Sequence, residues 1–148
     1  MKLNILLSPV TALIAMVVLL SGLVCGCGGK SNSAAEQAAS AAAQKWLTEI
    51  DNGQYGQSWQ DAASSFQGAI TKQKWVSALT GVRKPLGDLE SRKLAAARYT
   101  TQLPGAPDGQ YVVMQFDTSF ADKNSAVETV TFELEKDGQW KASGYFIK

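Results

Sequence analysis

Two charged side chains of opposite sign, Arg92 and Glu128, are the residues whose types and positions best suggest a polar site. Glu128 shares one side of a predicted strand with Val130 and Phe132, and Arg92 shares one side with Leu94 if residues 89–102 also form a strand. In a simple meander, both charges lie toward the same end of the sheet. Such a pair could orient an anionic or polar ligand at the mouth of a possible pocket. The alternative is a structural ion pair or two solvated rim residues, which we favour because perturbed charges are often structural.

A catalytic carboxylate is the second hypothesis for this site. A small hydrolase or isomerase could use Glu128 or Asp117 as its base. The chain has no histidine, which excludes histidine-based triads and the commonest zinc ligand. It has no serine nucleophile elbow, glycine-rich phosphate loop or metal motif, and Asp108-Gly109 lacks the alternating acidic ligands of a calcium loop. We therefore expect no metal and no cofactor, and we favour a protein that is not an enzyme.

The first 26 residues have the pattern of a cleaved export signal. Lys2 precedes an apolar run over residues 10–24, which is shorter than the roughly 20 residues of a bilayer-spanning helix. The sequence Val24-Cys25-Gly26-Cys27 resembles the lipobox of bacterial lipoproteins, which has an aliphatic residue three positions before the lipidated cysteine and a small residue just before it. We assign lipidation to Cys27, because Val24 is large for the position before cleavage at Cys25. The alternative is ordinary cleavage nearby, with a soluble secreted product.

This assignment divides the chain into a signal peptide (1–26), a lipidated tether (27–33) and one domain (34–148). Acyl chains on Cys27 would replace the apolar segment as the membrane anchor. By resemblance to lipoprotein sorting signals, the presence of Gly28 rather than aspartate after the cysteine favours the outer membrane, if the cell has one. We therefore expect a lipid-anchored protein of the cell envelope that faces the periplasm or the exterior.

Composition limits the partners that the domain can have. The chain has 14 lysines and arginines against 13 aspartates and glutamates, for a formal net charge of +1. Nucleic-acid binding needs clustered basic charge, so we expect no nucleic-acid partner. Both cysteines, Cys25 and Cys27, precede the domain, so its fold cannot depend on a disulfide. The expected partners are the membrane, through the lipid, and an unknown protein or small-molecule ligand.

The first half of the domain has the periodicity of helices. Apolar residues recur at three- and four-residue spacing from residue 35 to residue 50, after a capping box at residues 33–36, and Asn52-Gly53 ends this helix. The aromatic stripe of residues 55–66 predicts a second, shorter helix. Thr71 is expected to cap a third helix, which Pro85 and Gly87 terminate.

The second half alternates between apolar and polar residues, which is typical of strands with one face in water. Strands are predicted at residues 110–120, 126–135 and 139–148, and Asp137-Gly138 supplies the positive φ angles of a tight hairpin. Residues 89–102 suit a helix or a strand, and we predict a strand because the hairpins need a partner. The fold class is therefore α+β, with N-terminal helices packed on a C-terminal four-stranded antiparallel meander sheet. The apolar side of the last strand is expected to comprise Trp140, Ala142, Gly144 and Phe146.

Several segments together resemble a family of bacterial proteins known as domain of unknown function 4019. They include Ile50-Asp51-x-Gly53-x-Tyr55-x-x-Ser58-Trp59, Trp75 with Arg83-x-Pro85-Leu86-Gly87, Ser91-Arg92, residues 103–111, Glu128-Thr129-Val130 and Gly144-Tyr145. The order of helices and strands is also similar to the cystatin-like cone of nuclear-transport-factor-2-like domains, in which a sheet wraps over a helix and usually leaves a pocket. The four tyrosines that could line this pocket, or could pack at the edge of the core, are Tyr55, Tyr99, Tyr111 and Tyr145.

Neither resemblance decides the function. The family implies no activity, and the fold hosts enzymes, binding modules and oligomerisation domains. We therefore expect a membrane-anchored, non-catalytic binding or interaction domain, and the small hydrolase or isomerase is the alternative.

Overall fold

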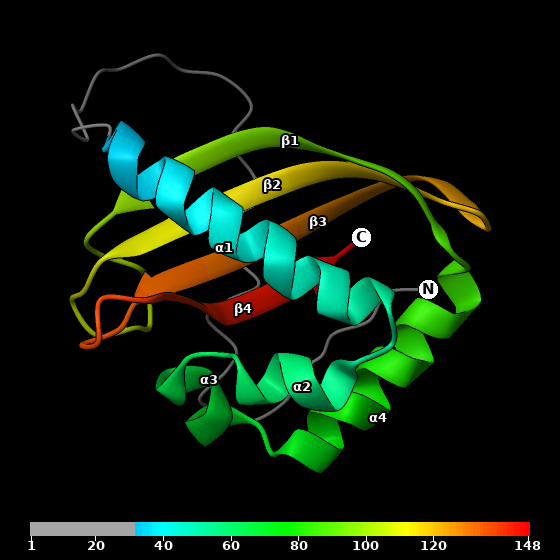
Figure 1. Cartoon of the computed structure of the whole chain (residues 1–148), viewed down its shortest axis with the longest axis horizontal. Helices are drawn as coiled ribbons and strands as arrows, with labels where there is room; N and C mark the ends of the chain where they lie inside the picture. Colours follow the sequence, from blue (N-terminus) through cyan, green and yellow to red (C-terminus); the bar gives the residue numbers. More distant parts are fainter. Residues whose placement is uncertain (1–31) are drawn as a thin grey trace.

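The computed structural model describes residues 32–148, in which helices precede a four-stranded sheet (Figure 1). The sheet has the order β1-β2-β3-β4 with antiparallel neighbours throughout, so the predicted α+β meander is confirmed. The predicted signal peptide, Cys27 and most of the tether lie outside the described residues. The elements are α1 (Ser33–Asp51), α2 (Tyr55–Gln60), α3 (Ser64–Ala69), α4 (Lys72–Arg83), the 3-10 turn η1 (Lys84–Leu86), β1 (Leu89–Thr100), β2 (Tyr111–Phe120), β3 (Lys123–Leu134) and β4 (Trp140–Ile147).

Helix α1 lies across one face of the sheet, and α2, α3 and α4 gather beside β4 (Figure 1). The main core lies between α1, α4 and this inner face of the sheet. Trp46 of α1 stacks on Trp75 of α4 with ring centroids 6.1 Å apart, and both indole N–H groups bond to the buried Ser58. These two tryptophans therefore pack in the core as aromatic residues are expected to do. None of the helices in the described part of the chain is both long and apolar enough to cross a bilayer.

The start of α1 differs from the prediction by one residue. Asn32 rather than Ser33 is the N-cap, and its side-chain oxygen accepts a hydrogen bond from the N–H of Ala35 at 3.2 Å. Glu36, which a capping box would turn back toward the cap, accepts instead from the backbone N–H of Tyr99 on β1 at 3.0 Å. The Glu36 carboxylate therefore bonds to the sheet and not to its own helix, because edge strand β1 has a free backbone N–H within reach.

The predicted second helix is two helices, which is a further correction. Helix α2 ends at Gln60 and α3 begins at Ser64. Between them, Ala63 is extended (φ −62°, ψ 152°) and donates its N–H to the carbonyl of Ala142 on β4 at 2.8 Å. The hydrogen bond to the sheet edge replaces a helical hydrogen bond at this point, so the helix breaks.

A register shift in β4 overturns part of the predicted alternation. Thr131 pairs with Gly144 but its neighbour Phe132 pairs with Ala142, so Ser143 is an extra residue and forms a bulge. Before the bulge Ala142 points inward as predicted. After it, Tyr145 pairs with the buried Val130, and Phe146 lies on the outer face, 40% exposed. The expectation that Gly144 and Phe146 share the apolar side is therefore wrong.

Candidate functional site

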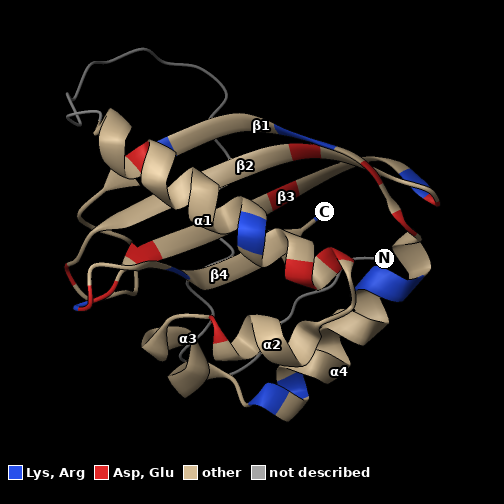
Figure 2. Ribbon diagram, viewed as in Figure 1, with Lys and Arg blue, Asp and Glu red and all other residues tan. Residues whose placement is uncertain are grey.

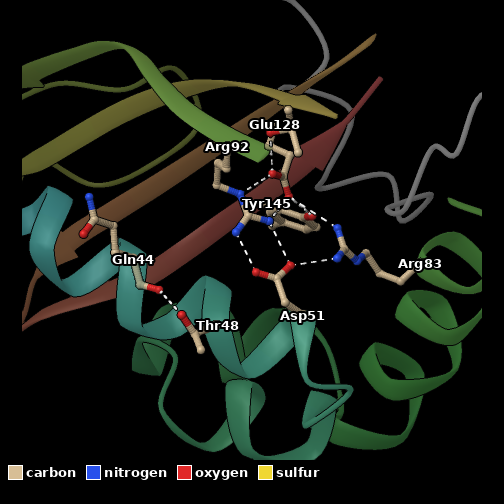
Figure 3. Close-up of polar contacts among 8 residues, drawn as sticks. Gln44, Thr48, Asp51, Arg83, Arg92, Glu128 and Tyr145 are labelled. Carbon is tan, nitrogen blue, oxygen red and sulfur yellow. Dashed lines mark hydrogen bonds and ion pairs between the residues drawn. The ribbon is translucent and has the colours of Figure 1, made fainter. Parts of the chain in front are cut away.

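A cluster of charged side chains lies where the C-terminal ends of α1 and α4 meet the inner face of the sheet (Figure 3). We call Asp51, Arg83, Arg92 and Glu128 the charge cluster. Asp51 is the last residue of α1 and Arg83 the last of α4, whereas Arg92 comes from β1 and Glu128 from β3. Figure 2 shows the acidic end of α1 and an acidic segment of β3 between basic segments of β1 and α4. Two cations and two anions from four elements therefore meet at one end of the sheet.

Glu128 is completely buried, and donors occupy both of its carboxylate oxygens. Oε2 accepts from Arg92 Nε at 2.6 Å and from the Thr118 hydroxyl at 2.7 Å. Oε1 accepts from the Tyr145 hydroxyl at 2.5 Å and from Arg92 Nη2 at 3.2 Å. A buried carboxylate is costly unless it is paired and hydrogen-bonded, and Glu128 meets both conditions.

Arg92 connects the two carboxylates of the charge cluster. Besides Glu128, it binds Asp51 with two parallel hydrogen bonds, from Nη1 to Oδ2 at 2.6 Å and from Nη2 to Oδ1 at 2.9 Å. This forked geometry is the strong form of an arginine–carboxylate contact. Burial lowers the pKa of Arg92, but the hydrogen bonds that it donates to Asp51 and Glu128, together with their negative charges, outweigh burial and leave the pKa above its ordinary value. Arg92 therefore fixes the end of α1 to β1 and β3 together.

Arg83 completes the charge cluster from the helical side. Its side chain is 5% exposed and donates from Nη2 to Asp51 Oδ1 at 2.7 Å. Its guanidinium lies over the ring of Phe120, 4.3 Å from the centroid, which is a cation–π contact. Nη1 lies 3.7 Å from Glu128 Oε1 and has no hydrogen-bond partner among the described residues. Asp51 stands at the unfavourable negative end of the α1 dipole, and the two guanidinium groups compensate for that position.

Three local features bring these side chains together. Gly53, at φ 72°, lets the chain leave α1 directly after Asp51. Gly87, at φ 74°, turns the chain from η1 into β1, and an added Cβ there would lie 2.8 Å from Asp122 Oδ2. The strand register then places Arg92 opposite Thr118, and Phe116 opposite Glu128, on the inner face.

The β4 bulge supplies the last donor of the site. Because Ser143 shifts the alternation, Tyr145 rather than Phe146 points to Glu128. Burial and the Glu128 carboxylate raise the pKa of Tyr145 well above its ordinary value, so its hydroxyl remains a donor. The same ring contacts Trp46 edge-on at 5.8 Å, so the polar site and the aromatic core share a residue.

This arrangement is suited to holding elements together and poorly suited to acid–base catalysis. The charges balance, and each oxygen of Glu128 already accepts hydrogen bonds, so Glu128 has no readily available lone pair for a substrate proton. Asp117, the other suggested base, is exposed on the outer face of β2. Within residues 32–148, no group of three or more histidine, cysteine, aspartate or glutamate side chains could hold a metal ion.

A surface groove lies elsewhere, between the first half of α1 and β1. It has a volume of about 410 Å³, and Glu36, Ser40 and Gln44 line one side of it. Leu94 and Ala97 line the β1 side, and Leu94 is 37% exposed. No member of the charge cluster lines this groove.

The structure brings the two predicted site residues, Arg92 and Glu128, into direct contact. Of the four tyrosines, Tyr145 joins them, whereas Tyr111 bonds to the carbonyl of Pro107 at 2.8 Å. Sequence reasoning missed the roles of Asp51 and Arg83. Both residues stand in the motifs that carry the family resemblance, as Tyr145 does, and those motifs were the available signal.

Comparison with protein-family models places most of the domain in a known family. The family model described as "Protein of unknown function (DUF4019)" matches residues 42–145, a range that contains the whole charge cluster. No curated protein and no solved structure matches the chain significantly.

Proposed function

The chain belongs to the family described as protein of unknown function DUF4019, and we propose that this member is a lipid-anchored domain of the cell envelope that binds a protein or small molecule without catalysis. The observation that carries the non-catalytic part is the state of Glu128. It is the fully buried acid of the described core, and donors from Arg92, Thr118 and Tyr145 occupy its two oxygens. The polar residues that the sequence suggested as a site, Arg92 and Glu128, therefore bind each other and neighbouring side chains in the fold.

Function then depends on surfaces that the charge cluster keeps in shape. One is the groove between α1 and β1, which combines the partly exposed Leu94 with polar side chains of α1. The other is the outer face of the sheet, which carries the exposed Phe146. Both are suited to a binding domain, in which rigid elements present the contact residues.

The proposed anchor explains where the membrane would lie. Cys27 is six residues before Ser33, the first residue of α1, and six extended residues span at most about 20 Å. Acyl chains on Cys27 would therefore keep the N-terminal end of α1, and the groove beside it, close to the bilayer surface. This placement gives the domain a short reach, which fits a partner at or near the same membrane.

Replacement of the anchoring cysteine tests the proposal. Cys27→Ala should move the protein from the membrane fraction to the soluble envelope or the medium, and mass spectrometry of the wild type should show a diacyl or triacyl N-terminal cysteine. Cys25→Ala is the matched control and should leave both results unchanged. If Cys25→Ala releases the protein and Cys27→Ala does not, the assigned cleavage site is wrong.

Photocrosslinking in intact cells tests the binding role. A photoreactive amino acid at Gln37 probes the groove side of α1, and one at Phe146 probes the outer face of the sheet. A discrete adduct at one position, and none at Lys136 in the β3–β4 turn, is the expected result. Absence of adducts at both positions would contradict a role in binding a protein.

A further inference from the structure

Strand β1 forms an edge of the sheet that is uncovered along most of its length. It is the outermost strand on the side away from α2, α3 and α4 (Figure 1). At the opposite edge, β4 receives a backbone hydrogen bond from Ala63. On β1, the Glu36 carboxylate takes the N–H of Tyr99, but no other backbone within residues 32–148 bonds to the free side of residues 90–98. Such an edge is a template for the addition of a further strand.

The side chains along this edge differ between the two faces of the sheet. On the inner face, Leu94 is 37% exposed and lines the groove beside α1. On the outer face, Glu90 accepts a hydrogen bond from the Ser119 hydroxyl at 2.9 Å, and Arg98 lies opposite Val113. Neither Glu90 nor Arg98 makes an ion pair in the part of the chain that the structure describes. The edge therefore carries one acid and one base whose charges are not paired there.

Glu90 and Arg98 lie at matching positions on either side of Leu94, each four residues away. Each half of this segment also contains one extra residue relative to β2, Glu90 itself in one half and Ala95 in the other. Because an extra residue reverses the alternation once, both charges lie on the outer face although Leu94 lies on the inner face. A strand with this pattern is complementary to a reversed copy of itself.

We infer that β1 pairs in antiparallel orientation with β1 of a second copy of the chain, about a two-fold axis beside Leu94. In this pairing Glu90 of each copy faces the partner's Arg98, and the two Leu94 side chains meet on the inner face. Opposite charges across an antiparallel ladder stabilise it, whereas like charges directly opposite destabilise it. Lys93 lies opposite the partner's Ala96, so no like charges meet.

A second copy fits this edge better than an unrelated strand does. An extended acidic segment would bring a carboxylate to Arg98 but would leave Glu90 without a cation. A regular strand is disfavoured because bulges turn an edge away from ordinary partners, whereas a second β1 has the same bulges at matching positions. The inference rests on the proposed role in binding a protein and names a second copy as that protein, but it does not require the lipid anchor.

The pairing is also compatible with two anchors in one membrane. The two-fold axis between antiparallel strands of one sheet is perpendicular to that sheet, and the interface uses the same surface of both copies. Two four-stranded sheets would therefore become one continuous sheet, with both α1 helices on the same face. The N-terminal ends of the two helices are then equivalent, so both can lie at the same distance from a bilayer.

Cysteine crosslinking tests the register, on the whole protein with the N-terminus that the cell produces. After mild oxidation, Leu94→Cys should give a disulfide-linked species of twice the mass of one chain, because opposite residues of an antiparallel pair have Cβ atoms about 4.5–5.5 Å apart. The wild type controls for Cys25 and Cys27. Phe146→Cys, on the outer face of β4, should give no such species. Crosslinking of Phe146→Cys alone, or none of Leu94→Cys above the wild type, would overturn the inference.

Charge reversal tests the identity of the partner by sedimentation equilibrium. Arg98→Glu and Glu90→Arg should each raise the Kd of the dimer by about tenfold or more, because like charges then face each other at two symmetry-related places. The double variant exchanges the two charges and should return the Kd close to that of the wild type. Lys136→Glu, in the β3–β4 turn, is the control and should leave the Kd unchanged. A wild type that stays monomeric, or single reversals without effect, would overturn the inference.

The photoreactive residue at Gln37 separates this inference from the binding role on which it rests. An adduct between two copies of the chain supports both. An adduct with a different protein, together with a monomeric wild type, would overturn the inference and leave the binding role in place.

Discussion

The two ends of α1 are attached to the sheet in different ways. At its C-terminal end, Asp51 accepts three short hydrogen bonds from two desolvated guanidinium groups. At its N-terminal end, the small residues Ala35 and Ala39 pack on the core, and the Glu36 carboxylate makes one hydrogen bond to the edge of β1. One end is fixed by charge, and the other rests on close contact beside an open groove.

This difference shows that one helix can be held rigidly at one end and border an accessible groove at the other. Desolvated ion pairs resist rearrangement because a broken pair leaves a buried charge without a partner. Small apolar residues give no such penalty when a neighbouring side chain moves. We therefore expect the C-terminal end of α1 to set the geometry of the fold, and its N-terminal end to tolerate change.

The largest effect is expected at the charge cluster. Glu128→Gln should lower the free energy of unfolding by about 3–5 kcal/mol, because it leaves two arginines to share the Asp51 carboxylate. Arg92→Met should have an effect of similar size, because it leaves Glu128 without its strongest donor. Urea unfolding followed by tryptophan fluorescence measures both values.

The double variant is the sharper test of this end. Removal of both Arg92 and Glu128 leaves the Asp51–Arg83 pair, at 2.7 Å, with balanced charge. The double variant should therefore lose less stability than the sum of the two single losses. Additive losses would show that the two residues do not interact in solution, and the contrast between the two ends of α1 would disappear.

A smaller effect is expected at the N-terminal end. Glu36→Ala removes the acceptor of the Tyr99 N–H and should cost about 1 kcal/mol, the usual net value of one hydrogen bond. Gln37→Ala, on the exposed side of the same turn, is the control and should change stability little. A loss at Glu36 as large as that at Glu128 would mean that both ends are equally fixed.

The smallest effect is expected in the groove. Leu94→Ser should change the free energy of unfolding by less than about 0.5–1 kcal/mol, because Leu94 is 37% exposed. Leu47→Ala, at a fully buried position of α1, is the reference and should cost about 2–5 kcal/mol. Comparable losses at both positions would indicate that the groove closes over Leu94 in solution.

Alternation along the strands was sufficient to predict part of the site. Arg92 and Glu128 share the inner face because no register shift falls between the pair Arg92–Thr118 and the pair Phe116–Glu128, whereas β1 is irregular just before Ser91 and just after Leu94. The strand at residues 89–100, which composition alone left open, is confirmed. The four-stranded meander followed from the same alternation and from the turn residues between the strands.

The helical half of the site could not be predicted in the same way. Helical periodicity shows which side of α1 is apolar, but the polar contacts of its last residue, Asp51, depend on how α1 and α4 rest on the sheet. The partner of Glu36 also lies 63 positions away in the chain, on a strand edge that local capping rules do not consider. The alternation also could not single out Tyr145 among the four candidate tyrosines, because the bulge that turns it inward leaves no clear mark in the sequence.

The bulge at Ser143 makes the chemistry of the site depend on chain length. Deletion of this one residue would exchange the positions of Tyr145 and Phe146 relative to the sheet. A phenyl ring would then face Glu128 in place of a hydroxyl, and the phenol would lie in water. In this domain, the insertion or deletion of one residue in β4 would therefore have the same effect on the inner face as a substitution, although every remaining residue keeps its identity.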